Sequence, residues 1–409
     1  MKTIMVIADG LGGRPGDTEQ GTCLEVARTP TLDKLAERGS VGLMNPIKPG
    51  IRPGSDTAHL SLFGYDPYKY YTGRGVFEAA GIGMELSDSD VSFRTNFATI
   101  DTNENIVDRR AGRIASHQGE LEDALADLHS EKYPKVKIRF KHSTEHRGAL
   151  SISGKELGDD LSPTDPHELE IPIPESRGRD KESEKTADIL NEVTKQAREI
   201  LEEHPVNQKR VEEGKLPANA ILSRGAAKYP DIPSIEETYG ITASVIAAGA
   251  LYIGVAKVIG MEYIPVEGAT GTVESNIINK AKTALEELNR GKDLVFVHFK
   301  GTDNASHDHN AKAKIEFIEK VDQTFAWFDD NIDWSETHLS FAGDHTTPIQ
   351  YGDHVAEPVP VLIVGPNVKL DTVNEFNEYS CVKGGLKVFN GQLLPVTLSY
   401  SNKLKKFGA

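Results

Sequence analysis

The sequence contains few cysteines, no long hydrophobic run and fewer basic than acidic side chains. Its two cysteines, Cys23 and Cys381, have neither metal-ligand spacing nor the pattern of a disulfide framework, so we expect both to be reduced packing residues. The longest apolar stretches, such as 244–254 and 359–364, are shorter than the about 20 residues that cross a bilayer, which argues against a membrane partner. No period of about 20–50 residues repeats, which argues against a solenoid.

The scarcity of positive charge restricts the partners of the chain. The 46 basic and 62 acidic residues give a net charge of −16. Non-specific nucleic-acid binding needs a basic surface, so we expect no nucleic-acid partner. A site for an anionic substrate must then be locally positive, and metal ions or a few arginines would supply that charge.

The first residues do not resemble a targeting segment. The apolar run 4–8 is too short for the core of a signal peptide, and no small-residue cleavage pattern follows it. We interpret it as a buried strand and expect a cytoplasmic location. The sequence does not indicate an oligomeric state.

Strand and helix patterns alternate at both ends of the chain and differ in the middle. Apolar runs predict strands, and amphipathic stretches predict helices after Thr29-Pro30 and over 311–328. The middle combines alternating strands, a loop with four prolines over 157–175 and a long charged helix over 181–203. We therefore predict an α/β domain formed by 1–79 and 233–409, interrupted by a smaller inserted α+β domain over 80–232.

Residues of metal-binding and nucleophilic types follow the predicted strands or lie in a glycine-containing turn. In an open α/β sheet, ligands bind beyond the carboxyl ends of the strands, so these side chains are expected to share one crevice. They are Asp9, Ser55, Asp303, His307, Asp344, His345 and His354.

The residue types indicate phosphoryl transfer. Carboxylate and imidazole together suit divalent ions such as zinc or manganese, and six such ligands are enough for two ions. Two metals roughly 4 Å apart clamp the attacking and leaving oxygens of an in-line displacement. A serine hydroxyl bound to one of them becomes a nucleophile.

Each of these residues alone also has an ordinary structural interpretation. Ser55 is a typical cap for the helix that is predicted to follow it. Asp9 fits a turn, Asp344-His345 fits a surface turn, Asp303 with its neighbours fits a solvated loop, and His354 fits a hydrogen-bonded core histidine. Their joint occurrence at the ends of strands favours the catalytic interpretation.

The order of these residues resembles the metal and nucleophile signature of the alkaline phosphatase superfamily. The resemblance implies a core sheet with helices on both faces. It also implies one metal site of Asp303, His307 and His354, and a second of Asp9, Asp344 and His345, with Ser55 as the fourth ligand of the second site and as the nucleophile.

Longer stretches resemble the cofactor-independent phosphoglycerate mutases, in the shorter branch first recognised in archaea. Ser223 and Ala227 depart slightly from the pattern of that branch, but neither is a proposed ligand. The matching stretches cover nearly the whole chain: 7–12, 53–60, 63–67, 72–75, 218–225, 254–257 and 341–348.

This resemblance implies that the enzyme interconverts 3-phosphoglycerate and 2-phosphoglycerate in glycolysis and gluconeogenesis, without bisphosphoglycerate. Ser55 would take the phosphoryl group and return it to the 2-hydroxyl of bound glycerate. The cofactors would be two divalent ions, with Mn²⁺ expected and Mg²⁺, Co²⁺ or Zn²⁺ as alternatives. The inserted domain would close over the site and exclude water while glycerate turns.

Several residues are predicted to bind the substrate. Arginine suits the glycerate carboxylate, and Arg224 is the best candidate because it lies in the matching stretch 218–225, with Arg94 as another. We expect Lys257 to contact phosphate and His59 to orient Ser55 or the phosphate. Asp165 and His167 are the candidates to carry the proton of the 2-hydroxyl. Scaffold salt bridges and packing are the competing interpretation for these side chains.

Other functions remain as alternatives. A metal-dependent phosphatase, a nucleotide pyrophosphatase or another phosphomutase would use the same metal chemistry. A sulfatase would need a formylglycine motif that the context of Ser55 does not resemble. A non-catalytic metal-binding protein would not need the serine nucleophile.

Overall fold

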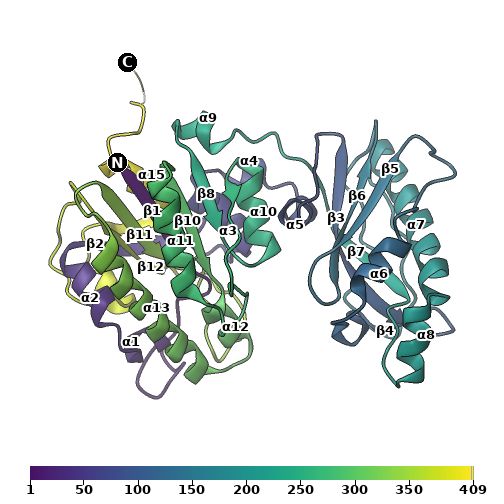
Figure 1. Ribbon diagram of the computed structural model, residues 1–409, viewed down its shortest axis with the longest axis horizontal. Helices are drawn as coiled ribbons and strands as arrows, with labels where there is room; N and C mark the ends of the chain where they lie inside the picture. Colours follow the sequence, from purple (N-terminus) through teal and green to yellow (C-terminus); the bar gives the residue numbers. More distant parts are fainter. Residues whose placement is uncertain (407, 409) are drawn as a thin grey trace. The chain divides into compact units, whose positions relative to one another are not determined.

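The computed structural model describes residues 1–406 and 408 and divides into two units (Figure 1). The first unit comprises Met1–Tyr71 and Ile232–Ala409, and the second comprises Thr72–Asp231. Residues 72–79 therefore group with the second unit, whereas the sequence pattern placed them in the first domain. The reason is helix α5 (Arg74–Gly81), which packs against three strands of the second unit.

The first unit is built on an eight-stranded mixed sheet in the order β13-β2-β12-β11-β1-β10-β8-β9. Strand β1 lies between β10 and β11 and is parallel to both. Strand β12 is antiparallel to its two neighbours. The strands are β1 (Lys2–Ala8), β2 (Gly39–Asn45), β8 (Ala243–Ile246), β9 (Glu262–Tyr263), β10 (Leu294–Phe299), β11 (Thr337–Ala342), β12 (Val359–Val364) and β13 (Lys387–Asn390).

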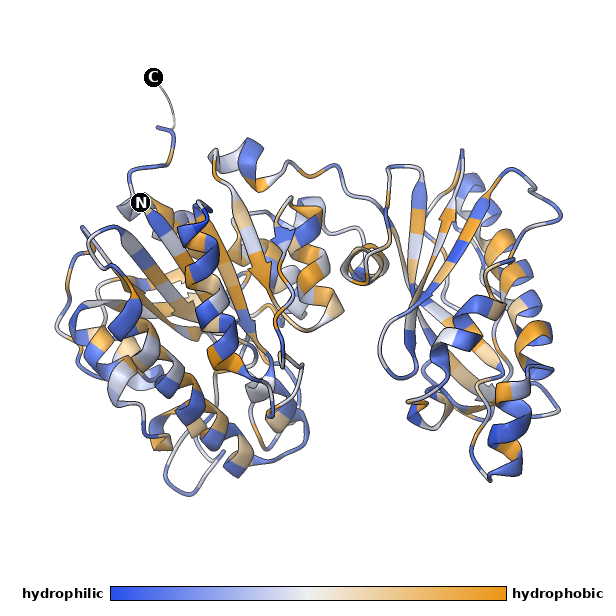
Figure 2. Ribbon diagram, in the orientation of Figure 1, coloured by the Kyte–Doolittle hydropathy of each residue, from blue (hydrophilic) through white to orange (hydrophobic). Residues whose placement is uncertain are grey.

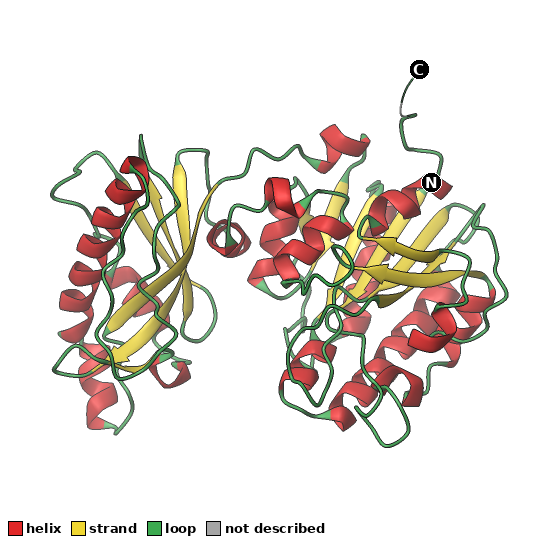
Figure 3. Ribbon diagram, turned by 180° about the vertical axis from the view of Figure 1, so that it is seen from behind, coloured by secondary structure: helices red, strands yellow, loops and turns green. Residues whose placement is uncertain are grey.

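Helices cover both faces of this sheet, as Figures 1 and 3 show. Ile4 and Val6 of β1 pack in one core with α2, α11 and α13, while Met5 and Ile7 point to the opposite face and are equally buried. Helices α3, α10 and α15 contact one another or the strands on that second side. A strand buried on both faces reads as a continuous apolar run, as 4–8 does. The predicted α/β class is confirmed.

The helices predicted after Thr29-Pro30, after Ser55 and over 311–328 are present in the first unit as α2, α3 and α13. Helix α2 begins at Pro30, whose fixed backbone angle suits the first turn, and α13 shows hydrophobic and hydrophilic positions along its length (Figure 2). The helices are α1 (Cys23–Val26), α2 (Pro30–Glu37), α3 (Ser55–Leu62), α4 (Pro67–Tyr70), α9 (Ile235–Tyr239), α10 (Ala250–Val258), α11 (Ile277–Asn289), α12 (Gly301–His307), α13 (Ala311–Asn331), α14 (Glu378–Cys381) and α15 (Leu393–Tyr400).

The second unit is an α+β arrangement around an antiparallel five-stranded sheet. Strand β3 pairs with β6 and β7, and β5 pairs with β6 at the edge of the sheet. Helix α7 buries the stripe that begins with Ile189 and Val193 against the sheet. The elements besides α5 are β3 (Asp90–Ile100), β4 (Ile106–Asp108), the 3-10 turn η1 (Ala111–Arg113), α6 (Gln118–Ala124), β5 (Lys137–His142), β6 (Arg147–Ser153), α7 (Lys181–Glu202), α8 (Pro205–Glu212) and β7 (Ala220–Lys228).

The two cysteines and the short apolar stretches each gave an expectation about the structure. Cys23 and Cys381 are both buried and free, as predicted. Within the described part of the chain, no helix has both the length and the apolar character that a membrane span requires.

Candidate active site

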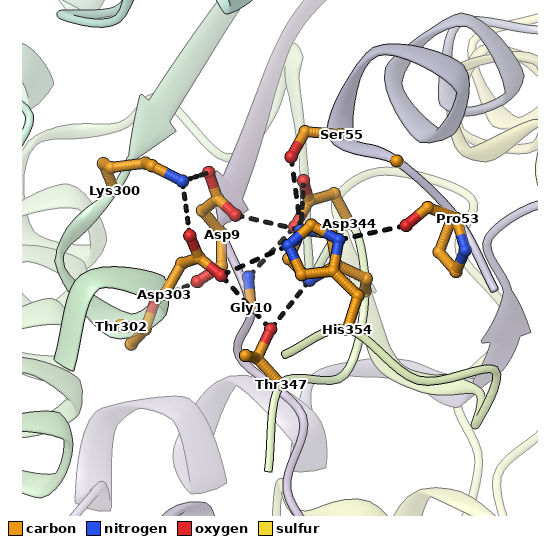
Figure 4. A network of polar contacts seen from close by, with 12 residues as sticks. Asp9, Gly10, Pro53, Ser55, Lys300, Thr302, Asp303, Asp344, Thr347 and His354 are labelled. Atoms are coloured by element: carbon orange, nitrogen blue, oxygen red, sulfur yellow. Dashed lines mark hydrogen bonds and ion pairs between the residues drawn. The ribbon is translucent and has the colours of Figure 1, made fainter. Parts of the chain in front are cut away.

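The candidate site lies at the carboxyl ends of three neighbouring parallel strands (Figure 4). Asp9 directly follows β1, Asp303 lies on α12 just after β10, and Asp344 follows β11. Because β1 is parallel to both β10 and β11, the three strand ends meet at one edge of the sheet. The topology therefore brings Asp9 together with two carboxylates that are more than 290 residues away in the sequence.

Helix α3 brings Ser55 to the same place. Gly54 is the N-cap and Ser55 is the first helical residue, so the Ser55 hydroxyl is not used as a helix cap. Ser55 Oγ lies 3.3 Å from Nε2 of His345. The helix N-terminus also directs partial positive charge toward the space in front of Ser55. Because Gly54 and not Ser55 is the N-cap of α3, the capping interpretation of Ser55 is wrong.

Asp9, Asp344 and His345 form one group with ligand atoms that all lie within 4.8 Å of one another. His345 Nε2 lies 3.2 Å from Asp9 Oδ1 and 3.3 Å from Asp344 Oδ2. All three side chains are buried. Burial, reinforced by the nearby Asp9 carboxylate, raises the pKa of Asp344 to about 7. The protein thus holds two acidic groups in contact with a single imidazole.

A second group forms around Asp303. His354 Nε2 lies 3.7 Å from Asp303 Oδ1, and His307 Nε2 lies 3.3 Å from Asp303 Oδ2. The most compact set, in which all ligand atoms lie within 4.8 Å of one another, consists of Asp303, His345 and His354. The rings of His345 and His354 stack at 3.5 Å between centroids. His307 therefore lies beside Asp303 but outside the most compact set, so its predicted role as a ligand needs a separate test.

The imidazoles of both groups are oriented by hydrogen bonds from their other nitrogen. Nδ1 of His307 donates to the carbonyl of Gly352 at 2.7 Å, and Nδ1 of His354 donates to the carbonyl of Pro53 at 3.0 Å. Nδ1 of His345 lies 2.9 Å from the hydroxyl of Thr347, which itself donates to Asp303. These contacts direct the Nε2 of each histidine toward the carboxylates, and Nε2 is the nitrogen through which the imidazole would bind a metal.

The carboxylates also fit a divalent cation. Oδ2 of Asp344 is buried and has no hydrogen-bond partner among the described residues, and the side chain of Asp9 beside it is also fully buried. Buried acceptors without donors are costly unless a cation neutralises them. Together with the three oriented imidazoles, this donor set fits two divalent ions.

Comparison with known proteins identifies the family. The family model of 2,3-bisphosphoglycerate-independent phosphoglycerate mutase matches residues 36–207. The mutase of that name from Methanococcus aeolicus is 45% identical over 412 residues, covering 100% of both chains. One from Methanocaldococcus jannaschii is also 45% identical, covering 100% of this chain and 99% of its own. The chain belongs to this family. The resemblance seen in the sequence is confirmed.

Solved structures agree with this assignment to the mutase family. A protein from Pyrococcus horikoshii superimposes with a TM-score of 0.88 at 39% identity, covering 100% of this chain and 99% of its own. The cofactor-independent phosphoglycerate mutase from Thermoplasma acidophilum gives a TM-score of 0.71 at 34% identity, covering 98% of this chain and 100% of its own. The similarity extends over both units of the mutase chain.

The structure adds three site residues that the sequence interpretation missed. Lys300 Nζ lies 2.9 Å from Asp9 Oδ2 and also contacts Asp303. His298 Nε2 lies 3.3 Å from the same Asp9 oxygen. The Tyr252 ring stacks on His298 at 3.7 Å between centroids. A histidine inside the apolar run 294–299 and a lysine directly after it were the signals available in the sequence.

Lys300 changes the electrostatics of the site. Burial opposes the ionisation of Asp9, but Lys300 and the imidazoles of His298 and His345 outweigh it and hold the pKa of Asp9 well below its ordinary value. Burial also opposes the charge on Lys300, and the Asp9 carboxylate outweighs it and raises the pKa of Lys300 well above its ordinary value. Asp9 and Lys300 therefore form a buried ion pair at the centre of the site.

Two predicted residues of the first unit lie around this centre. His59 has no exposed surface, and its Nδ1 donates to the carbonyl of Ser55 at 2.6 Å. Its contact with Ser55 thus runs through the backbone, which favours an orienting role over substrate contact. Lys257 lies in the last turn of α10, about 7.5 Å along the helix axis from Tyr252. Its phosphate contact stays a prediction.

The second unit contains its own polar cluster, which includes the other predicted residues. Arg94 of β3 is directly opposite Arg224 of β7 in the sheet register. Asp165 receives two hydrogen bonds from Arg109, at 2.7 and 2.8 Å, and lies 3.4 Å from Arg224 Nε. The backbone of His167 donates to the same carboxylate at 3.2 Å. Side chains from three separate segments therefore meet here.

This cluster has unused capacity to bind an anion. Nε of Arg94 is buried without a hydrogen-bond partner within the described residues, and Nε of Arg224 has only its 3.4 Å ionic contact with Asp165. Burial, partly offset by Glu78, lowers the pKa of Arg94 to about 10, which leaves the guanidinium charged at neutral pH. Two charged guanidiniums side by side fit a carboxylate of a small substrate.

Proposed function

We propose that the chain interconverts 3-phosphoglycerate and 2-phosphoglycerate through a phosphoserine formed on Ser55, without bisphosphoglycerate. The observation that carries this proposal is the position of Ser55 Oγ, 3.3 Å from His345 Nε2 and beside two carboxylate–imidazole groups. Membership of the mutase family supports 3-phosphoglycerate and 2-phosphoglycerate as the two molecules that are interconverted.

Two divalent ions are the proposed cofactors. Asp9, Asp344 and His345, with Ser55, would hold one ion. Asp303, His307 and His354 would hold the other. When bound, these ions stabilise the attacking and leaving oxygens of phosphoryl transfer and lower the pKa of the serine hydroxyl. Mn²⁺ is our first choice, and Mg²⁺, Co²⁺ and Zn²⁺ offer compatible chemistry with carboxylate and imidazole.

The proposed reaction needs two transfers at the same serine. Ser55 Oγ attacks the phosphorus of 3-phosphoglycerate, the bond from phosphorus to the 3-oxygen breaks, and the serine proton passes to that oxygen. Glycerate then turns, its 2-hydroxyl oxygen attacks the phosphoserine and the bond from phosphorus to Ser55 Oγ breaks. Ser55 Oγ regains a proton in exchange for the one that the 2-hydroxyl gives up, so the serine is regenerated. The N-terminus of α3 stabilises the negative charge on the phosphoserine.

The polar cluster of the second unit is proposed to bind the organic part of the substrate. Arg94 and Arg224 would hold the carboxylate by charge-assisted hydrogen bonds. Partial desolvation lowers the pKa of His167, and its imidazole would accept the proton of the 2-hydroxyl. Asp165 would keep the guanidiniums in position through its contacts with Arg109 and Arg224.

A turnover assay tests this function directly. The protein is treated with EDTA, each divalent metal is restored separately, and 3-phosphoglycerate is supplied without bisphosphoglycerate. Both 2-phosphoglycerate and free phosphate are followed. We expect metal-dependent formation of 2-phosphoglycerate with little free phosphate.

The other outcomes separate the alternatives. Free phosphate without 2-phosphoglycerate would indicate a metal-dependent phosphatase, with the carboxylate cluster misassigned. No reaction with any metal would contradict the mutase and would favour another member of the superfamily or a non-catalytic metal-binding protein. A cytoplasmic location, proposed for an enzyme of central metabolism, is checked by fractionation of the source cells.

A further inference from the structure

The second unit contains a large cavity that is separate from every residue proposed for catalysis. It has a volume of about 1080 Å³ and is lined only by residues between Glu85 and Lys185. It lies at the end of the sheet where β5 begins and β6 ends, since Lys137 pairs with Ser153 there. Ser153 in turn pairs with Asp90 at the start of β3.

The lining of this cavity is strongly cationic in a chain that is acidic as a whole. Its acidic members are Glu85 and Asp90, and Asp90 already accepts a hydrogen bond from Arg139 at 3.0 Å. Residues 132–141 contain five basic and no acidic side chains, whereas the whole chain has a net charge of −16. The cationic lining residues are Lys132, Lys135, Lys137, Arg139, Lys155 and Lys185.

Three of these lysines are available to an anion. Lys132 is paired with Asp188, and Lys185 donates to the carbonyl of Lys155 at 2.7 Å. By contrast, the ammonium groups of Lys135, Lys137 and Lys155 have no ion pair or hydrogen bond within residues 1–406 and 408, and their side chains are exposed. Like charges gathered around one cavity repel each other, and a bound polyanion would relieve that repulsion.

The cavity also offers an apolar wall. Leu86, Tyr133, Pro134 and Val136 line it beside the lysines. The hydroxyl of Tyr133 donates to Asp188 at 3.0 Å, which fixes the ring, and Lys185 Nζ lies 5.6 Å from the ring centroid. Small-molecule sites typically combine such apolar walls with a few placed polar groups.

Protection of a sheet edge does not explain this arrangement. Strand β5 is an edge strand, and charged side chains such as Lys137 discourage pairing with another sheet. That function accounts for lysines within β5. It does not account for Lys135 before the strand, Lys155 after β6 or Lys185 on α7, which line the same cavity.

We propose that this cavity binds a small organic molecule that carries at least two phosphate groups, of the class of a nucleoside diphosphate. Lysine ammonium groups bind phosphate as point charges, and three available lysines match more than one phosphate. The apolar wall accommodates the organic portion. This site is additional to the proposed function and does not depend on it.

Calorimetric titration of the full chain with ADP and with pyrophosphate tests the proposal. Both titrations are made after EDTA treatment, so that neither probe binds through a metal ion. The cavity variant is K135Q/K137Q/K155Q, and the matched control is K181Q/K195Q/K209Q, which removes three exposed lysines of the same unit from outside the cavity. Circular dichroism verifies that both variants are folded.

We expect ADP to bind the unmodified chain and the control equally, and the cavity variant at least about tenfold more weakly. Saturating 3-phosphoglycerate should leave ADP binding unchanged. Absence of ADP binding, equal affinity in the cavity variant, or displacement by 3-phosphoglycerate would each overturn the site. Pyrophosphate binding as tight as ADP binding would overturn the assignment of an organic ligand.

Discussion

Lys300 Nζ lies 2.9 Å from Asp9 Oδ2, and the same ammonium contacts Asp303. Asp9 and Asp303 belong to different proposed ligand sets, so one lysine connects the two halves of the candidate metal centre. The ammonium also lies over the Tyr252 ring, 5.3 Å from the ring centroid. Lys300 therefore supplies positive charge to the centre when metal is absent.

This position predicts that Lys300→Met destabilises the metal-free protein more than the metal-loaded protein. Without metal, the variant leaves buried carboxylates unpaired, which costs about 3 kcal/mol of unfolding free energy. With Mn²⁺ bound, the ions take over the neutralisation and the loss shrinks. Denaturant unfolding with EDTA and with Mn²⁺ measures both values. Equal losses would contradict this role, and Lys312→Met, at an exposed lysine of α13, is the control.

Ser55→Ala should lower kcat by at least about a thousandfold, because the phosphoryl group then has no acceptor on the protein. The fold and the metal content should be nearly unchanged, since Ser55 does not cap α3. Steady-state kinetics and metal analysis provide the measurement. Ser61→Ala, on the same helix, serves as the control. Full activity of the Ser55 variant would exclude Ser55 as the nucleophile.

His307→Ala should reduce the bound metal from about two ions per chain to about one. His307 Nε2 lies 3.3 Å from Asp303, although the most compact group contains His345 instead. Metal content after dialysis, determined by mass spectrometry, decides the matter. The nearby His309, whose Nδ1 donates to the carbonyl of Ile349 at 2.7 Å, provides the control variant His309→Ala. Retention of both ions would remove His307 from the ligand set.

Arg224→Lys should raise the KM for 3-phosphoglycerate about ten- to a hundredfold. Lysine keeps the charge but cannot present two parallel N–H groups to a carboxylate. Initial-rate kinetics should show a larger effect on KM than on kcat, together with an increased fraction of free phosphate. Arg198→Lys, on α7, is the matched control. An unchanged KM would assign Arg224 to the scaffold.

We predict that the burial of His146 makes the folded protein less stable at acid pH. Burial, reinforced by Arg147 and Arg94, lowers the pKa of folded His146 to about 3. The unfolded chain, with a histidine pKa of about 6.5, then binds more protons between these values. The free energy of unfolding therefore falls as the pH drops from about 6.5 toward 3, by at most about 1.4 kcal/mol per pH unit.

His146→Gln should flatten this dependence, as measured by urea unfolding at a series of pH values. The exposed His129→Gln on the same unit is the control. An identical pH dependence in the unmodified chain and in the His146 variant would show that other groups cause the loss of stability.

Local patterns in the sequence were sufficient to predict much of this protein. The apolar run 4–8, buried on both faces, predicted β1, and the apolar stripe over 181–203 predicted α7. Asp9 and Asp344 were identifiable as site candidates because each follows a strand, and strand ends form the site in this class of fold. Each of these features depends on side chains only a few residues apart.

Long-range packing decided the rest. Lys300 and Tyr252 meet at Asp9 only because β8 and β10 are neighbours in the sheet and α10 follows β8. Arg94 faces Arg224 only through the register of β3 with β7. No local periodicity specifies which strands pair or in what register, because those choices depend on the burial of whole faces. The sequence by itself determined which residues can perform the chemistry, and the tertiary structure decided which of them meet.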